Sequence, residues 1–315
     1  MKIVSKFCAA VALSAAATTV MAEDCKPSKW GIDDTIGSAN LVTPERTLMA
    51  AELIKQGKSM PLGITIGPDT PAFPPRSLSL QIVQPNQQGG QKLTGFGYEG
   101  NYNDDVLQTW IGIGSQLDGL GHLGENGYYY NCSSEKEISV ITGLTKLGTH
   151  DVPPLIGRGI VLDMAAQAGV EVLQAGQSFG SAEIKDAAKK QGVEIREGDI
   201  ILFYTGWTDV NFVDNPVLWG QAEPGLDNEG AVYLASLNPM AVGADTWGVE
   251  AVPPKEGDKV FYGHVTLLKE NGIYLLETMN VGPLLKEGVN EFMFVLGQNR
   301  IRGAVQAMIN PVALY

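Results

Sequence analysis

The chain has 315 residues, of which 44% are hydrophobic and 18% are charged. This apolar content supports a substantial core and excludes global disorder. Lys and Arg number 22 against 35 Asp and Glu, a net charge of −13, and the sequence contains no basic cluster. Nucleic acids and anionic membranes require positive patches, so we expect neither as a partner.

The N-terminus has the features of a secretory signal. Lys2 and Lys6 precede a run of apolar and small residues that is too short to cross a bilayer. This run ends in the small-x-small pattern Val20-Met21-Ala22, which is typical of a cleavage site. We therefore expect a signal peptide over residues 1–22, a single mature domain over residues 23–315 and a periplasmic or secreted location. An ordered N-terminal helix is the alternative.

Two cysteines, Cys25 and Cys132, remain after the predicted cleavage. Export to an oxidising compartment allows these thiols one intramolecular disulfide, and two free thiols are the alternative. Two cysteines and three histidines are too few for a zinc-finger type of site. The sequence also lacks the GxGxxG, GxxxxGK[ST] and GxSxG patterns, which disfavours a dinucleotide site, a P-loop and a serine hydrolase.

The first predicted element is a short helix that Thr43 caps. Pro44 suits its first turn, and Gly57 suits a left-handed exit at its end. Residues 78–82 then alternate between apolar and polar side chains, which predicts a strand with one buried face.

A second helix is predicted over Ser181–Gln191, because its apolar residues follow the i, i+3, i+4 spacing and Gly192 can end it. Continuous apolar runs predict strands buried on both faces at Ile160–Leu162, Ile200–Phe203 and Phe292–Leu296. Strands therefore outnumber helices, and the mixture indicates an α/β or α+β domain with a substantial sheet. This pattern does not determine the topology.

His122 ends a glycine-rich segment, Gly112–His122, that carries three polar side chains. Gln116 and Asp118 are two residues apart, so on an extended chain they point to the same side, and His122 has the same parity. An amide oxygen, a carboxylate and an imidazole on one face suit a divalent metal or a general base. The alternative is a polar loop with a hydrogen-bonded histidine.

His264 and Glu277 form a second candidate group. Glu277 closes a strand-like apolar run, and a carboxylate at the end of a buried run costs free energy unless it is paired or bound to metal. A solvent-exposed glutamate at a strand end is the alternative. His150 lies beside two prolines, and we interpret it as a surface-loop residue.

The segment Gly243–Glu250 places two carboxylates and the indole of Trp247 between an apolar run and a pair of prolines. We interpret it as part of a pocket wall or as a supporting layer behind the site. A sheet-edge turn in which Asp245 caps backbone N–H groups is the alternative.

Together these segments resemble the metal-dependent cyclase family, which includes bacterial kynurenine formamidase, isatin hydrolase and trans-dienelactone hydrolase. The resemblance extends from Lys29 to the end of the chain. It implies an α/β fold of the swivelling β/β/α type, with a mixed sheet core and flanking helices, usually in a homodimer or homotetramer. The shared blocks, in chain order, are residues 29–34, 69–75, 114–122, 157–163, 198–207, 243–247 and 264–277.

The family signature His-x-Gly-Thr-His-x-Asp-x-Pro-x-His is altered in this chain. It reads Gly112-x-Gly114-Ser115-Gln116-x-Asp118-x-Leu120-x-His122. The resemblance implies that Asp118, His264 and Glu277 hold a metal, together with the side-chain oxygen of Gln116. Two imidazoles of the signature are replaced, by Gly112 and Gln116. The resulting oxygen-rich set suits one Mn²⁺ better than two Zn²⁺, although either metal stays open.

The resemblance implies metal-assisted hydrolysis of a small cyclic amide, lactone or N-acyl (including formyl) compound. Metal-activated water would attack the carbonyl, and His122 would accept and return a proton. Phe73, Trp110 and Trp247 are candidate substrate-binding walls of a pocket for a small, flat molecule.

Two other functions stay open. One is a catalytically inactive periplasmic protein that binds a small molecule on the same fold. The other is a metal-free cyclase or lyase that uses His122 with Asp118 or Glu277 as an acid–base pair.

Overall fold

The computed structural model describes residues 25–83, 97–98, 100 and 103–315. The predicted signal peptide over residues 1–22 therefore lies outside the described residues. In the described part of the chain, no helix is long and apolar enough to cross a membrane.

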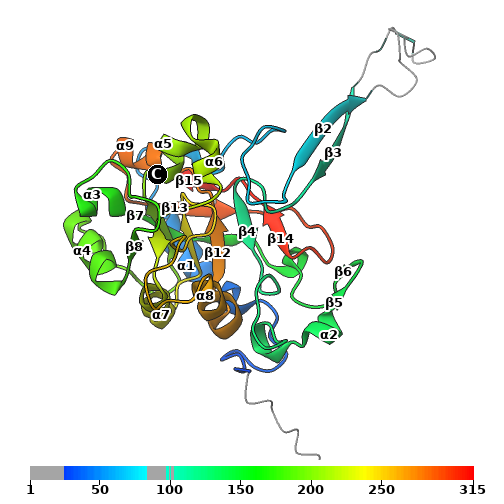
Figure 1. Ribbon diagram of the computed structural model, residues 1–315, viewed down its shortest axis with the longest axis horizontal. Coiled ribbons are helices and arrows are strands. Elements are labelled where there is room, and N and C mark those ends of the chain that lie inside the picture. Colours follow the sequence, from blue (N-terminus) through cyan, green and yellow to red (C-terminus); the bar gives the residue numbers. More distant parts are fainter. Residues whose placement is uncertain (1–24, 84–96, 99, 101–102) are drawn as a thin grey trace, which may run out of the picture.

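Helices and strands alternate along most of the chain (Figure 1). The α-helices are α1 Pro44–Ala51, α2 Glu135–Ile138, α3 Met164–Ala168, α4 Ser181–Gln191, α5 Trp207–Asp214, α6 Pro216–Trp219, α7 Asn228–Ser236, α8 Tyr262–His264 and α9 Gly282–Lys286. Shorter helical segments of other types are Gly37–Leu41, Tyr130–Cys132, Thr149–Asp151 and the π-helical Val265–Glu270.

The strands belong to one large sheet and three small ones. Those of the large sheet are β1 Ser59–Pro61, β4 Gln116–Asp118, β7 Leu155–Asp163, β9 Ile200–Tyr204, β11 Ala241–Ala244, β12 Tyr274–Glu277, β13 Glu291–Leu296, β14 Gln306–Met308 and β15 Val312–Leu314. The small sheets pair β2 Leu78–Val83 with β3 Asp104–Thr109, β5 Ser139–Val140 with β6 Gly143–Leu144, and β8 Ser178–Phe179 with β10 Gly225–Leu226.

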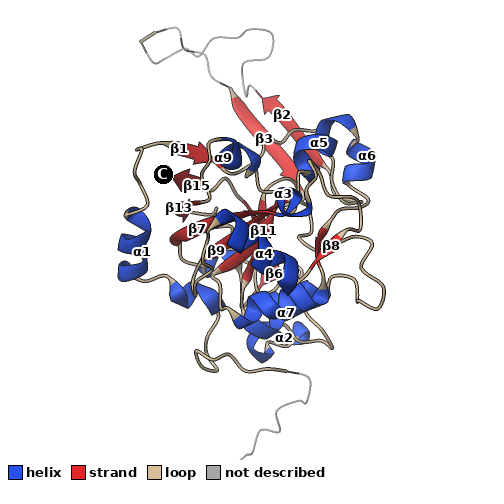
Figure 2. Cartoon of the chain, turned by 90° about the vertical axis from the view of Figure 1, so that its left-hand side faces the viewer, coloured by secondary structure: helices blue, strands red, loops and turns tan. Residues whose placement is uncertain are grey.

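The large sheet is mixed, and its described strands follow the order β1-β15-β13-β7-β9-β11-β12-β4-β14. Its centre, β7-β9-β11-β12, is parallel, and the strands on either side are antiparallel. Helices α4 and α7 lie in front of the central strands in Figure 2. This α/β architecture confirms the expected fold class. It also puts β12 and β4 side by side, and these strands carry the candidate site residues.

The buried central strands confirm two of the three predicted apolar runs. Ile160–Leu162 and Ile200–Phe203 are inaccessible to solvent, as expected for parallel strands covered on both faces. The prediction of two buried faces is wrong for Phe292–Leu296, where buried and partly exposed residues alternate. This run forms β13, which lies near the edge of the sheet, so only one of its faces points into the core.

The two predicted helices differ in outcome. The second is confirmed as α4, with Gly192 in the left-handed conformation at its end. In the first, the Thr43 side chain accepts the N–H of Arg46, as predicted. The predicted end at Gly57 is wrong, because the helix stops at Ala51 and the following chain pairs with the carbonyl oxygen of Tyr315.

Residues 78–83 form the predicted strand, β2, but its predicted burial is wrong. β2 pairs with β3 as a two-stranded arm that projects from the body (Figure 1). Leu80 lies opposite Leu107 on one face of the arm, and the two side chains are 46% and 47% exposed. Ile82 on the same face is 64% exposed. The apolar face predicted by the alternation therefore exists, but the described residues do not cover it.

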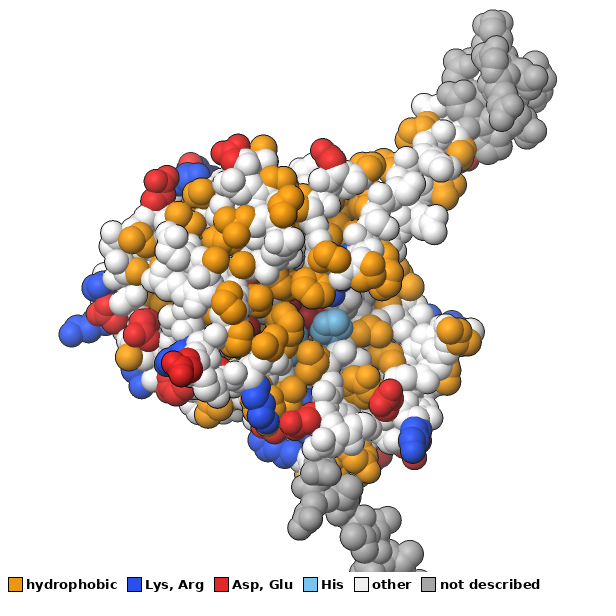
Figure 3. Space-filling view, in the orientation of Figure 1, with side chains coloured by type: hydrophobic (Ala, Val, Ile, Leu, Met, Phe, Trp, Pro, Cys, Tyr) orange, Lys and Arg blue, Asp and Glu red, His pale blue; other side chains and the backbone are white. Residues whose placement is uncertain are grey.

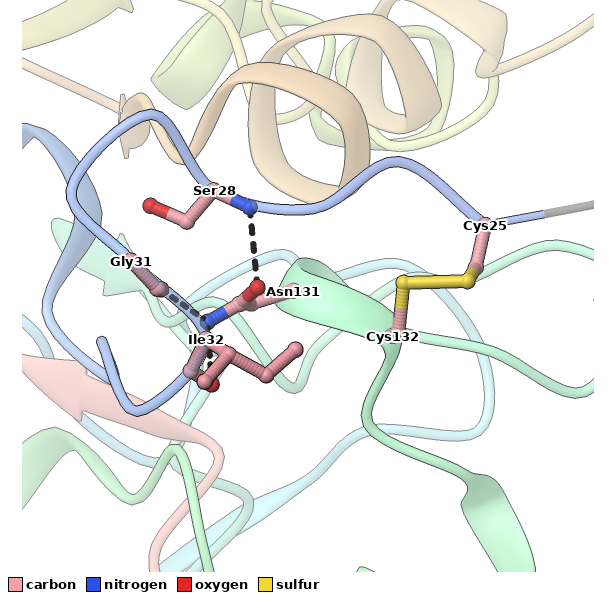
Figure 4. The surroundings of a disulfide bond; sticks show 6 residues. All are labelled: Cys25, Ser28, Gly31, Ile32, Asn131 and Cys132. Carbon is pink, nitrogen blue, oxygen red and sulfur yellow. Dashed lines mark hydrogen bonds between the residues drawn. A yellow bond between two sulfur atoms is a disulfide. The ribbon is translucent and has the colours of Figure 1, made fainter. Parts of the chain in front are cut away.

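Cys25 and Cys132 form the disulfide that the sequence allows, and not two free thiols; it links residues 107 positions apart (Figure 4). The side chain of the neighbouring Asn131 accepts the N–H of Ser28 at 2.8 Å and donates to the carbonyl oxygen of Gly31 at 2.9 Å. The covalent bond and these hydrogen bonds fasten the start of the described chain to the same short helical segment.

Candidate functional site

The site is built on three neighbouring strands, β12, β4 and β14. Gln116 and Asp118 lie at the two ends of β4 and point to the same face, as their spacing predicts. The register pairs Gln116 with Glu277 of β12, and Asp118 with Gln306 of β14. Directly opposite residues of antiparallel strands share a face, so these four side chains meet although the sequence separates them widely.

Asp118 is the most enclosed member of this group, with no exposed surface. Its Oδ1 accepts a hydrogen bond from Nε2 of Gln306 at 2.7 Å. Its Oδ2 is buried and has no hydrogen-bond partner among the described residues. Nε2 of His122 and Nε2 of His264 each lie 3.6 Å from this oxygen. Two imidazoles and one carboxylate oxygen therefore converge on a small volume.

His122 reaches this point from a turn and not from the strand. β4 ends at Asp118, and the N–H of His122 donates to the carbonyl oxygen of Gly119 at 2.9 Å. The prediction that His122 continues the strand face of Gln116 and Asp118 is therefore wrong. The prediction that His122 lies near Asp118 is confirmed. A Cβ at Gly119 would lie 2.6 Å from the carbonyl oxygen of Val305, so only glycine fits where the chain turns.

His264 lies at the end of α8, surrounded by carboxylates. Its Nε2 is 3.3 Å from Oε1 of Glu277, the last residue of β12. Its Nδ1 is 2.6 Å from Oε1 of Glu250. Both glutamates are buried, which excludes the solvent-exposed alternative for Glu277.

Gln116 presents its amide nitrogen to the carboxylates. Its Nε2 donates to Oε2 of Glu277 and lies 3.5 Å from Oδ1 of Asp118. The resemblance implied that the side-chain oxygen of Gln116 faces a metal. In this arrangement Gln116 acts as a hydrogen-bond donor, so its role as a ligand stays a prediction.

The acidic groups shift one another's ionisation. Burial and the nearby Asp118 carboxylate raise the pKa of Glu277 to about 7. Burial also opposes ionisation of Asp118, but His122 and His264 hold its pKa below the usual value. Burial and the charge of Glu277 raise the pKa of Glu223, a fully buried residue nearby. Glu277 and Glu223 therefore hold their protons more tightly than free carboxyl groups do.

The pKa values of the two histidines move in opposite directions. Burial lowers the pKa of His122, which keeps its imidazole neutral and able to accept a proton. Burial alone would also lower the pKa of His264. Interactions with Asp118, Glu250 and Glu277 instead raise it well above the usual value.

The donor set fits a divalent cation. Single ligand atoms of Asp118, His122 and His264 lie within 4.8 Å of one another. Two ligands that are each about 2.1 Å from an ion stand roughly 3.0–3.4 Å apart, which is longer than a charge-assisted hydrogen bond. The observed 3.3 Å and 3.6 Å separations around Nε2 of His264 resemble the ligand spacing more closely. A cation would also bind Oδ2 of Asp118, which accepts no hydrogen bond from the described residues.

A small cavity of about 100 Å³ opens onto these residues. Its aromatic walls are Phe73, Trp247 and Phe261, and the ring centroids of Phe73 and Trp247 are 5.1 Å apart. In Figure 3 a histidine side chain reaches the surface among hydrophobic side chains. Trp110 is not among the residues that line this cavity. It lines a separate hollow of about 580 Å³ beside β3, so its assignment to the same pocket stays without support.

Comparisons with known proteins identify the family and the fold of the chain. Residues 60–251, more than half of the chain, match the family model described as "Putative cyclase". The chain belongs to the cyclase family. No curated protein matches it.

Solved structures share the fold of this cyclase-family chain. A structure described as a novel cyclase is 27% identical, with a TM-score of 0.80, over 91% of this chain and 96% of that one. Isatin hydrolase A from Ralstonia solanacearum is 15% identical, with a TM-score of 0.60, over 86% and 97%. A metal-dependent hydrolase from Bacillus stearothermophilus, itself described as predicted, is 16% identical, with a TM-score of 0.53, over 81% and 97%.

Arg76 gives a physical reason for one departure from the family signature. Its Nη1 donates to the carbonyl oxygen of Gly112 at 2.5 Å, and a Cβ at Gly112 would lie 2.5 Å from that nitrogen. In this member of the cyclase family, a guanidinium therefore occupies the space beside the position where the signature has a histidine. Arg76 also lines the cavity with His122 and Glu277.

Several residues of the cyclase-family site had no local sequence signal. Gln306 contacts Asp118 across 188 positions, and neither residue type nor spacing indicates that pairing. Glu223 and Arg76 were missed for the same reason. Glu250 lies in the segment interpreted as a pocket wall or supporting layer. That segment does both, because Trp247 lines the cavity and Glu250 contacts His264.

Proposed function

We propose that the chain is a metal-dependent hydrolase that acts on a small cyclic amide, lactone or N-acyl compound. The observation that carries this proposal is the convergence of two imidazole nitrogens on the buried Oδ2 of Asp118, which has no hydrogen-bond partner among the described residues. A buried carboxylate oxygen without a donor is costly, and a bound cation would compensate it. The isatin hydrolase and metal-dependent hydrolase of the same fold support the reaction class.

Asp118, His264 and Glu277 would hold the ion, and Mn²⁺ or Zn²⁺ suits a mixture of carboxylates and imidazoles. A divalent cation in such a site polarises a carbonyl and makes water easier to deprotonate. His122 lines the cavity as a neutral imidazole. It would accept the proton that water loses and return it to the nitrogen or oxygen of the bond that breaks.

The cavity walls support a small, flat substrate. Phe73, Trp247 and Phe261 line the cavity, and aromatic faces bind planar rings. Hydrolysis of an amide or a lactone releases a carboxylate. Arg76 can hold that carboxylate by a two-pronged hydrogen bond, because no described carboxylate forms an ion pair with it and it lines the same cavity.

The location and assembly of the protein are further parts of the proposal. We infer that the protein is exported, because the Cys25–Cys132 disulfide is typical of oxidising compartments. We also infer a homodimer or homotetramer. The exposed apolar face of the β2–β3 arm supports this, since a two-stranded sheet is only marginally stable alone and identical faces can pair about a two-fold axis.

The second candidate function is binding without catalysis. It is favoured by the hydrogen bond from Gln116 to Glu277, which satisfies one carboxylate oxygen without a metal. Elemental mass spectrometry of protein purified without chelator, before and after loading with Mn²⁺ or Zn²⁺, tests the metal. About one ion per chain, followed by turnover in a screen of formamides, lactones and cyclic imides, is expected. Tight ligand binding without turnover of any loaded form would favour the second function, and full activity after chelation would favour metal-free acid–base chemistry.

A further inference from the structure

Glu250 lies behind His264 and accepts hydrogen bonds from two consecutive residues. Its Oε1 accepts the N–H of His264 at 2.8 Å, and its Oε2 accepts the N–H of Gly263 at 2.7 Å. Oε1 is also 2.6 Å from Nδ1 of the His264 ring. Because both carboxylate oxygens already accept backbone N–H groups, Nδ1 is the donor in this third contact. Nε2 is thereby left to face Asp118 and Glu277.

The backbone around Glu250 is held in an unusual conformation. Val249 has φ +63°, a rare value for a β-branched residue, and the N–H of Glu250 donates to the carbonyl oxygen of Gly248 at 2.6 Å. The N–H of Leu226 fixes the carbonyl oxygen of Val249 at 2.9 Å. Strained turns of this kind persist only where the surrounding structure determines them, and they occur most often at functional sites.

Glu250 packs tightly against the backbone of α8. A Cβ at Gly263 would lie 2.6 Å from Cδ of Glu250, so glycine is required where the carboxylate approaches the backbone. Glu250 is 3% exposed, which protects its hydrogen bonds from competition by water. The strained backbone, the close packing and the three polar contacts thus all hold the imidazole of His264 in one orientation.

We propose that Glu250 is a positioning residue that fixes the tautomer and ring orientation of His264 for metal binding. This inference rests on the proposed function, because it assigns Nε2 of His264 to the cation. A carboxylate that accepts from the far nitrogen of a ligand histidine increases the basicity of the near one, and its loss weakens metal binding about 10–100-fold. Among the described residues, Glu250 does not line the cavity, and its hydrogen bonds go to Gly263 and His264 and not to Asp118 or Glu277.

Two substitutions separate the parts of this role. Glu250→Gln keeps one acceptor for His264 but places an amide donor against the N–H of Gly263. Glu250→Ala removes all three contacts. Asp227→Asn is the matched control, because Asp227 is a buried carboxylate that accepts the N–H of Gly230 at 2.7 Å at the start of another helix, α7.

The test measures Zn²⁺ affinity by competition with a chromophoric chelator, and the tautomers by ¹⁵N NMR of histidine-labelled protein. The full chain has three histidines, so their ring nitrogens can be assigned. In the Zn²⁺-loaded wild type we expect His264 to be protonated at Nδ1. We expect Glu250→Ala to bind Zn²⁺ at least about 10-fold more weakly, Glu250→Gln to lie between it and wild type, and Asp227→Asn to match wild type.

The outcomes distinguish this inference from the proposed function. If both Glu250 variants bind Zn²⁺ with wild-type affinity and the His264 spectrum is unchanged, Glu250 is not a positioning residue. That result would not affect the proposed metal site. A wild-type chain that binds neither Zn²⁺ nor Mn²⁺ would overturn the proposed function, and the positioning role with it. Circular dichroism of each variant excludes loss of the fold as the cause of weaker binding.

Discussion

The Asp118→Asn substitution tests the metal site at its most buried atom. Gln306 donates to Oδ1 of Asp118, so the oxygen of an asparagine at this position would remain there to accept that hydrogen bond. The amide nitrogen would then take the place of Oδ2, the atom on which His122 and His264 converge. An amide NH₂ group donates hydrogen bonds and does not bind a cation. The variant therefore removes one charged ligand and changes the side-chain volume little.

The size of the effect follows from linkage between binding and folding. At a metal concentration about 1,000 times Kd, binding adds about 4 kcal/mol to the free energy of unfolding. For a chain of this length, that corresponds to a rise in Tm of about 7 °C. If Asp118→Asn weakens binding about 1,000-fold, only about 0.4 kcal/mol remains, which is a rise below about 1 °C.

Differential scanning calorimetry with and without Mn²⁺ or Zn²⁺, after removal of endogenous metal by chelation, measures this rise. Asp227→Asn serves as the control, and we expect it to keep the full metal-dependent rise even if its starting Tm is lower. An Asp118→Asn protein that keeps the wild-type rise would refute the assignment of Asp118 as a ligand.

Three further predictions concern the proposed base His122, the buried acid Asp245 and the β2–β3 arm. We expect His122→Ala to keep the metal-dependent rise in Tm and to lower kcat at least about 100-fold on a substrate from the screen. If the variant loses the metal-dependent rise in Tm, His122 is a metal ligand. Burial raises the pKa of Asp245 to about 7, so its stabilising protonated form is lost as pH rises through that value. The unfolding free energy of metal-free wild type, relative to Asp245→Asn, should therefore fall by about 2 kcal/mol between pH 5.5 and pH 8.5 in chemical denaturation, and a constant difference would contradict the raised pKa. We expect Ile82→Lys, on the exposed face of the arm, to lower the molar mass measured by light scattering, and an unchanged oligomer would show that the arm is not the interface.

The parts of the fold that the sequence predicts well are those set by local periodicity. The helix Ser181–Gln191 has an apolar stripe and a glycine that ends it, and the structure has the same bounds. Ile160–Leu162 and Ile200–Phe203 are apolar throughout because both of their faces are buried. The early end of α1 could not be predicted in this way. It depends on pairing with Tyr315, which is more than 250 positions away.

The same distinction applies to the site. Gln116 and Asp118 share a face because strand geometry alternates, and this is a local rule. The meeting of Asp118 with His264 and Glu277 was implied by the family resemblance and not by their spacing. Gln306 could not be found by either route, since its contact with Asp118 is created by the order of the strands in the sheet. The sequence did single out the segment that contains Glu250, but not its contact with His264, which depends on the strained turn at Val249.

The arrangement of acids favours a cation over a purely structural role. Asp118, Glu250 and Glu277 surround the single imidazole of His264, and all three are buried. Buried carboxylates beyond those that a histidine can neutralise destabilise a fold, and the raised pKa of Glu277 reflects that cost. Replacing such groups by apolar residues of similar size is often stabilising. A chain that keeps them, and holds one of them in place by a strained turn at Val249, is better explained by a bound cation that offsets their charge.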